Sequence, residues 1–181
     1  AAGQHALEMV EAGASIIDVG GESTRPGATR VDEEEQIARV VPVIQSILNK
    51  CNTIISIDTT RLSVAIAAID VGATIINDVS AGIEDPEILS LAASEGVGVV
   101  LMHRRLPPEL DSYSDQYVVD PTSPNITQEV CSWLMERVSV AESCGVNPNS
   151  IAIDPGLGFG KSVEQNLHLV EHVEHLVMTG Y

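Results

Sequence analysis

Residues 62–82, LSVAIAAIDVGATIINDVSAG, decide the fold, because a helical segment, a glycine and a short apolar strand follow one another there. Gly72 stands where a helix commonly ends in the left-handed conformation, and a β-branched run then leads to Asn77 and Asp78. The same order recurs along the chain. Five apolar runs end at Asp18, at Asp58, at Asn77 with Asp78, at His103 and at Asp154, and four of them follow Gly13, Gly72, Gly96 or Gly145.

This repeated unit predicts an α/β fold with a parallel sheet, because strands that are apolar on both faces need helices to cover them. We expect a (β/α)8 TIM barrel rather than an open doubly wound sheet, since no Gly-x-Gly-x-x-Gly follows the first strand and polar residues end all five strands. A complete barrel takes about 250 residues, and this chain has 181. The prediction is a single domain over residues 1–181, a partial barrel of about five strands, truncated at both ends, that lacks the first strand and the last two.

One helix can be predicted in detail from DEEEQIARVVPVIQSILNK, residues 32–50. Asp32 is the expected N-cap, and the acidic residues after it complement the helix dipole. Pro42 is expected to kink or divide this helix, because proline removes a backbone hydrogen bond.

The net charge of −17 argues against nucleic acid and anionic membranes as partners, because both need basic patches. The three cysteines, Cys51, Cys131 and Cys144, show no Cys-x-x-Cys spacing and indicate reduced, structural thiols. No apolar run approaches the roughly 18 residues of a spanning helix, and no secretory signal is visible. We expect a soluble, cytoplasmic protein.

The polar residues at the strand ends are candidate ligand contacts, because the carboxyl ends of parallel strands meet at one mouth. Carboxylates and an amide there suit a flat polar heterocycle with several N–H groups. For a single position, a helix cap or an Asx turn is an equally good interpretation. A magnesium cluster is the other alternative, although no Asp-x-Asp pair anchors one.

Two glycine-rich loops are further candidates. GGESTRPGATR, residues 20–30, offers Ser23, Thr24 and Arg25 on a loop that could close on an anion, or alternatively forms an ordinary turn. Arg30, beside the acidic DEEE run, is expected to pair locally. In DPGLGFGK, residues 154–161, the spacing is not that of a nucleotide P-loop, and Phe159 either stacks on a planar ligand or packs.

Two other features are less informative. His168, His172 and His175 lie on one helical face, and without a His-Glu-x-x-His pattern a solvated or subunit-facing stripe is favoured over a zinc site. Residues 103–125 are long, polar and proline-rich, which is typical of a lid, an interface loop or an insertion.

Taken together, IIDVGGESTRPGA, SIDTT, TIINDVSAG, VVLMH and IAIDPGLGFGK closely resemble the dihydropteroate synthase family of pterin-binding barrels over nearly the whole chain. The resemblance implies condensation of 7,8-dihydropterin-6-ylmethyl diphosphate with 4-aminobenzoate, giving 7,8-dihydropteroate and pyrophosphate. Sulfonamides mimic the aminobenzoate. The resemblance also implies Mg²⁺ as cofactor and a homodimer.

The same resemblance assigns roles position by position. The pterin pocket would be lined by Asp58, Asn77 and Asp154, with Met102 against the ring. The catalytic contacts to the diphosphate and the aminobenzoate region would be Thr24 and Arg25, with Pro26 shaping the same site. Gly158 and Phe159 would form the aminobenzoate side, and supporting roles fall to Asp18, Ser23 and Lys161. No metal ligand is assigned within this segment.

The family's Asn on the first strand, its Ser-Arg-Lys segment and its Arg-x-His are absent from these residues. We therefore expect residues 1–181 alone to be inactive. The alternatives are a methyltetrahydrofolate-binding methyltransferase of the same barrel family, against which the STRPG loop argues, and a non-catalytic pterin-binding remnant.

Overall fold

The computed structural model describes residues 2–181, which form five strands and seven α-helices. The strands are β1 (Ile16–Gly20), β2 (Ile54–Asp58), β3 (Ile75–Asp78), β4 (Gly98–Met102) and β5 (Ile151–Asp154). The helices are α1 (Ala2–Glu11), α2 (Glu33–Leu48), α3 (Leu62–Asp70), α4 (Glu87–Glu95), α5 (Ile126–Ser143), α6 (Val163–Glu171) and α7 (Glu174–Val177).

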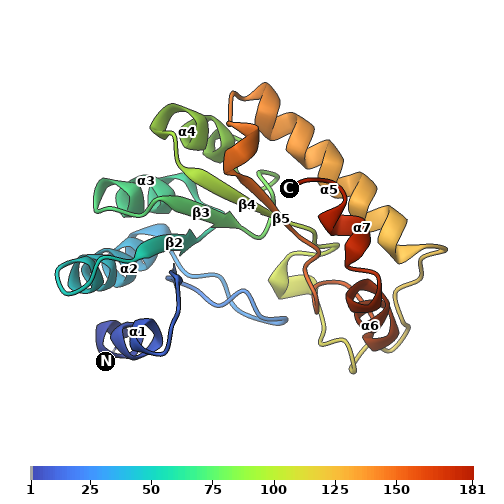
Figure 1. The fold of residues 1–181 in the computed structure, drawn as a ribbon. Helices are drawn as coiled ribbons and strands as arrows, with labels where there is room; N and C mark the ends of the chain where they lie inside the picture. The colour runs from blue at the N-terminus through green and yellow to red at the C-terminus, as the bar shows by residue number, and fades with distance from the viewer. Residues whose placement is uncertain (1) are drawn as a thin grey trace.

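The strands form one sheet in the order β1-β2-β3-β4-β5, and every neighbouring pair is parallel. Helices α1 to α5 follow one another in an arc around the outside of this sheet, and α6 and α7 lie beside α5 (Figure 1). The predicted five-stranded parallel partial barrel is confirmed.

The two faces of the sheet differ in burial. The face toward the helices carries the core, in which Ile55, Ile57 and Ile76 are fully buried. On the opposite face, Ile16 and Ile54 stay 48% and 47% exposed. Since register partners in a parallel sheet point to the same side, this open face also carries Asp18, Asp58 and Asn77.

Local expectations are met at the helix ends. Asp32 caps α2 by accepting a hydrogen bond from the Glu34 amide at 2.9 Å. The four glycines placed at helix ends all have positive φ, as expected of Gly13, Gly72, Gly96 and Gly145. Pro42 lies inside α2 without dividing it.

Two strand ends differ from the prediction. β1 continues to Gly20, so Asp18 lies in the middle of the strand, and β4 ends at Met102 rather than His103. In the described part of the chain, no helix has both the length and the apolarity needed to cross a membrane. All three cysteines are free and partly buried.

Candidate active site

Four of the predicted binding residues lie on the open face at the carboxyl ends of the strands. The register places Asp58 beside Asn77 and Met102 beside Asp154. Asp58 and Asn77 are half-buried, whereas Met102 is 3% exposed. The accessible part of this group is therefore polar, with Asp58, Asn77 and Asp154 able to hydrogen-bond a ligand, while Met102 lies almost wholly beneath the surface.

The environment of Asp58 disfavours its charged form. Burial, followed by the charges of Asp18, Glu22 and Asp78, raises its pKa to about 7. Its Oδ1 atom is buried and has no hydrogen-bond partner. Gly20, its register partner, has no side chain to cover it, and a Cβ there would lie 3.4 Å from Asp58 Oδ2. Asp58 is therefore ready to accept hydrogen bonds from a ligand.

Asp18 orients a second member of the group. Asn77 Nδ2 donates to Asp18 Oδ2 at 3.1 Å, from a strand two positions away in the sheet. This contact fixes the direction of the Asn77 amide, which fits the supporting role predicted for Asp18.

Asp78 does not join the site, so the expectation that all strand-end side chains converge is wrong for this residue. Adjacent residues of a strand point to opposite faces, and Asp78 points to the helix side, fully buried. It accepts hydrogen bonds from the Ser80 amide and hydroxyl, each at 2.7 Å, and from the Gly82 amide at 2.6 Å. Asp78 therefore forms an Asx turn.

The STRPG loop, residues 20–30, carries one guanidinium that is available to a ligand. The Arg25 amide donates to Ser23 Oγ at 3.3 Å, and the Arg25 side chain is exposed without an ion pair to any residue in 2–181. Thr24 and Pro26 are half-buried in the same loop. Arg25 is thus free to meet an anion.

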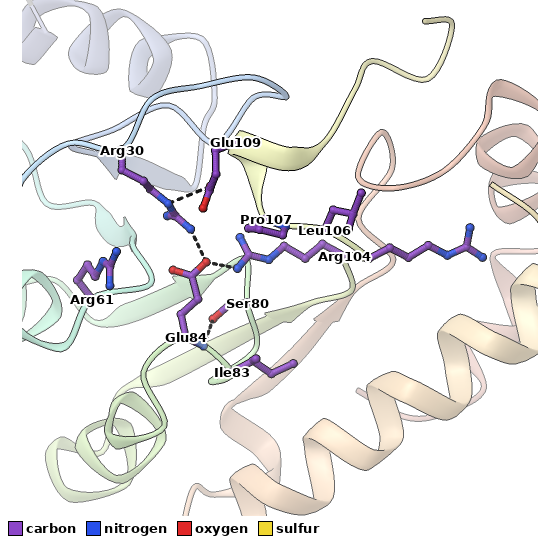
Figure 2. Close-up of a pocket in the computed structure, with 10 residues that line it drawn as sticks. Arg30, Arg61, Ser80, Ile83, Glu84, Arg104, Leu106, Pro107 and Glu109 are labelled. Atoms are coloured by element: carbon purple, nitrogen blue, oxygen red, sulfur yellow. Dashed lines mark hydrogen bonds and ion pairs between the residues drawn. The ribbon is translucent and has the colours of Figure 1, made fainter. Parts of the chain in front are cut away.

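Arg30 has the opposite character: it pairs locally, as expected, with Glu22 of its own loop, but its other partners are distant in sequence and none of the three belongs to the DEEE run. It pairs with Glu22 at 2.9 Å. It also pairs with Glu109 at 3.2 Å and with Glu84, as Figure 2 shows. Burial alone would lower the pKa of Arg30, but the hydrogen bond to Glu22 and the Glu84 and Glu109 charges raise it overall. Arg30 therefore anchors the loop.

Arg30 and Glu84 line a pocket of about 490 Å³. None of the residues predicted to bind the pterin lines this pocket. Glu84 binds Arg104 as well as Arg30, and accepts from the Thr60 hydroxyl at 2.7 Å. The Val31 amide donates a hydrogen bond to Glu22 at 3.0 Å. Together these contacts hold the two ends of the loop of residues 20–30 in place. Sequence reasoning missed Glu22 and Glu84. The only signal was that each is an acid beside a glycine-containing turn.

Lys161 organises the second glycine-rich loop. It is fully buried and donates to the carbonyls of Gly156 at 2.8 Å, Phe159 at 3.0 Å and His103 at 3.2 Å. Burial, and then Arg105, lower its pKa to about 7, although nearby carboxylates act in the other direction. The Gly156 amide donates to Asp154 Oδ1 at 2.7 Å, which ties the loop to β5.

Gly158 and Phe159 form the outer part of this loop. The Gly158 amide donates to Asn166 Oδ1 at 2.9 Å, and a Cβ at Gly158 would meet no atom within 4 Å. Phe159 is half-buried. Space is therefore open beside the turn, and the contact of both residues with aminobenzoate stays a prediction.

The described residues offer no preformed metal centre. Within 2–181, no group of three His, Cys, Asp or Glu side chains is arranged to hold an ion. The His168 and His172 rings stack with centroids 4.1 Å apart, beside His175 in a groove of about 710 Å³. A magnesium ion bound in this segment would need substrate phosphate oxygens beside one or two carboxylates.

The described residues thus form a parallel barrel segment with carboxylates and an amide at its strand ends, beside a loop with an exposed guanidinium. Residues 1–181 match the family described as pterin binding enzyme. The chain belongs to this pterin-binding family.

The relatives are more specific. The dihydropteroate synthase of Mycobacterium leprae is 46% identical over 182 residues, and that of Streptococcus pyogenes is 43% identical over 178. Both alignments cover 98% of this chain, and they cover 60% and 62% of those proteins. The chain thus spans about three fifths of the length of the relatives that it matches.

Solved structures agree. The Xanthomonas albilineans dihydropteroate synthase with 4-aminobenzoic acid has a TM-score of 0.87 and 39% identity. The structure of the Xanthomonas albilineans dihydropteroate synthase in complex with 7,8-dihydropteroate has a TM-score of 0.83 and 35% identity. Each comparison covers 98% of this chain and 60% of that one.

Proposed function

We propose that the protein containing this chain is a dihydropteroate synthase, which condenses 7,8-dihydropterin-6-ylmethyl diphosphate with 4-aminobenzoate. The observation that carries the proposal is the unpartnered, buried Oδ1 of Asp58 on the open sheet face, in register with Asn77. The names and ligands of the relatives support it, since one solved structure holds 4-aminobenzoic acid and another 7,8-dihydropteroate.

In this proposal Asp58, Asn77 and Asp154 bind the N–H edge of the pterin, and Met102 packs against the ring. A buried carboxylate that gains N–H donors replaces a missing hydrogen bond, which favours the ligand. Thr24 and Arg25 then meet the diphosphate and the aminobenzoate region. Pro26 and Phe159 would wall the same space.

The reaction is a substitution at the pterin methylene. The bond from the methylene carbon to the diphosphate oxygen breaks, the aniline nitrogen forms the new bond and then loses a proton, and pyrophosphate leaves. We propose an SN1-like course, in which the electron-rich ring stabilises a developing cation. The protein needs no nucleophile, and its residues act by orienting the reactants and stabilising charge.

Mg²⁺ remains part of the proposal for the complete protein, where it would neutralise pyrophosphate. Within residues 2–181, no group of three His, Cys, Asp or Glu side chains is arranged to hold the ion. We also propose a cytoplasmic homodimer. The family resemblance supports the dimer and the free cysteines support a reducing compartment.

The test is release of pyrophosphate by the full-length protein from the dihydropterin diphosphate, with and without 4-aminobenzoate. We expect release to depend on 4-aminobenzoate and dihydropteroate to appear in equal amount by mass spectrometry. Transfer of a methyl group from methyltetrahydrofolate to a cobalamin, measured in parallel, would favour the methyltransferase instead. Binding of pterin without either reaction would favour the non-catalytic remnant.

A further inference from the structure

The segment of residues 104–117 lies between the two glycine-rich loops and contacts both. On one side, the Gly27 amide of the STRPG loop donates to the Pro108 carbonyl at 2.7 Å. Arg30 of the same loop pairs with Glu109, as Figure 2 shows. The segment is thus joined to the STRPG loop by a backbone hydrogen bond and an ion pair.

On the other side, the segment contacts the loop of residues 154–161. Asp111 is only 7% exposed, and its Oδ2 accepts from the Gly160 amide at 2.8 Å. Arg105 Nη1 donates to the Gly160 carbonyl at 3.2 Å. Gly160 has φ +69°, and a Cβ there would lie 2.6 Å from Arg105 Cβ. Only glycine permits this close approach.

Asp111 is itself held in place. Its Oδ1 accepts from the Ser112 amide at 2.9 Å and from the Tyr117 hydroxyl. Burial, followed by the hydrogen bond to Asp111, raises the pKa of Tyr117 to about 12, so the hydroxyl stays a donor at neutral pH. Arg105 is anchored to α5 through Glu129, at 2.7 Å. The contact to Gly160 therefore comes from a fixed group.

Phe159 lies between two restrained amides. The Gly158 amide is held by Asn166 of α6, and the Gly160 amide is held by Asp111 from a segment 49 residues away. Phe159 itself donates its amide to the Gly156 carbonyl at 3.1 Å and accepts at its carbonyl from Lys161 at 3.0 Å. Since the flanking glycines have no side chains to pack against the ring, we expect its position to depend on these backbone contacts, including those of the two flanking amides. Removal of one restraint should let the ring change position.

We propose that Asp111 is a positioning residue for the aminobenzoate side of the site. Asp111 holds the Gly158–Gly160 turn in place. Pro108 and Glu109 of the same segment contact the loop that carries Thr24 and Arg25, so the segment also determines the position of the turn relative to that loop. This inference rests on the proposed function, and it gives residues 103–125, whose role the sequence left open, a place in substrate binding.

The test uses the full-length protein and compares Asp111→Ala and Asp111→Asn with Asp115→Ala, an exposed acid in the same segment. In Asp111→Ala we expect KM for 4-aminobenzoate to rise on the order of tenfold, from loss of a charged hydrogen-bond acceptor. KM for the dihydropterin diphosphate should change less than about twofold. Asp111→Asn keeps one acceptor oxygen but turns its NH2 group toward the donors on the other side, so it should restore only part of the affinity. Asp115→Ala should match the wild type.

The split between KM and kcat keeps the test decisive if Asp111→Ala is partly unfolded. Unfolding lowers the concentration of active enzyme, and so kcat, but it leaves KM unchanged. Hydrogen exchange adds a readout independent of turnover, with faster exchange at the Phe159 and Gly160 amides expected in Asp111→Ala alone.

Two results would overturn the inference while leaving the proposed function intact. One is a wild-type KM for 4-aminobenzoate in active Asp111→Ala, and the other is an equal change in both KM values. No aminobenzoate-dependent turnover in the wild-type protein would instead overturn the proposed function, and the inference with it.

Discussion

At the scale of single residues, Asp58 links binding to stability. Burial and three neighbouring carboxylates raise its pKa from an ordinary 3.8 to about 7. The folded protein therefore holds this proton more tightly than the unfolded chain does. As a result, the contribution of Asp58 to stability is full below pH 3.8 and is lost as the pH rises to about 7.

Replacing Asp58 by Asn should remove this cost. At pH 8 we expect Asp58→Asn to raise the free energy of unfolding by on the order of 2 kcal/mol, and at pH 5 to change it much less. Urea denaturation at the two pH values measures the difference. Asp120→Asn, at an exposed position, is the control. Equal changes at both pH values would show that Asp58 does not titrate in this range.

The residue scale also separates what the sequence could predict from what it could not. Asp32 and Gly96 follow local chemistry, so their roles as helix cap and helix end were predictable. The expectation that Asp78 faces the ligand side was wrong and avoidable. Side chains alternate along a strand, so Asn77 and Asp78 must point to opposite faces. The roles assigned to the pterin contacts came from the family resemblance.

At the scale of elements, Lys161 acts as the internal support of the loop of residues 154–161. Three carbonyl oxygens, from two different segments, converge on its amine. A sequence cannot show this, because the His103 carbonyl lies 58 residues away along the chain. Arg30 illustrates the same limit, since its partner Glu84 is 54 residues away.

Lys161→Met should keep the apolar stem and remove the donor. Because three carbonyls would lose a partner in a buried setting, we expect the free energy of unfolding to fall by on the order of 2–4 kcal/mol. Thermal or urea denaturation measures it. Lys50→Met, at an exposed position, is the matched control and should stay within about 0.5 kcal/mol of the wild type. A result for Lys161→Met as small as this control would contradict the support role.

At the scale of the whole molecule, helices cover one face of the sheet, and the other face is partly exposed (Figure 1). Within residues 2–181, β1 and β5 each pair on one side. The open face exposes about half of Ile16 and Ile54, at the opposite ends of their strands from the polar group around Asp58. Water can therefore reach the face on which the pterin is expected to bind. Exclusion of water strengthens the electrostatic contacts that such a reaction needs.

A protein made only of residues 1–181 should therefore release no pyrophosphate under conditions in which the longer protein does. Besides the open face, it lacks the Asn, Ser-Arg-Lys and Arg-x-His elements that the family resemblance implies. The same assay applied to both proteins at equal concentration measures the difference. Aminobenzoate-dependent turnover by residues 1–181 would show that this segment suffices.

The contrast between Arg25 and Arg30 has a consequence for how the protein can diversify. Arg30 forms ion pairs with three carboxylates, so most replacements at this position would destabilise the fold. Selection against misfolded protein would then eliminate such variants, whatever their ligand preference. The Arg25 side chain has no such ties in the described chain, and its replacement costs the fold little. Under selection by a competing ligand, we therefore expect replacements that change ligand preference to occur at position 25 and not at position 30.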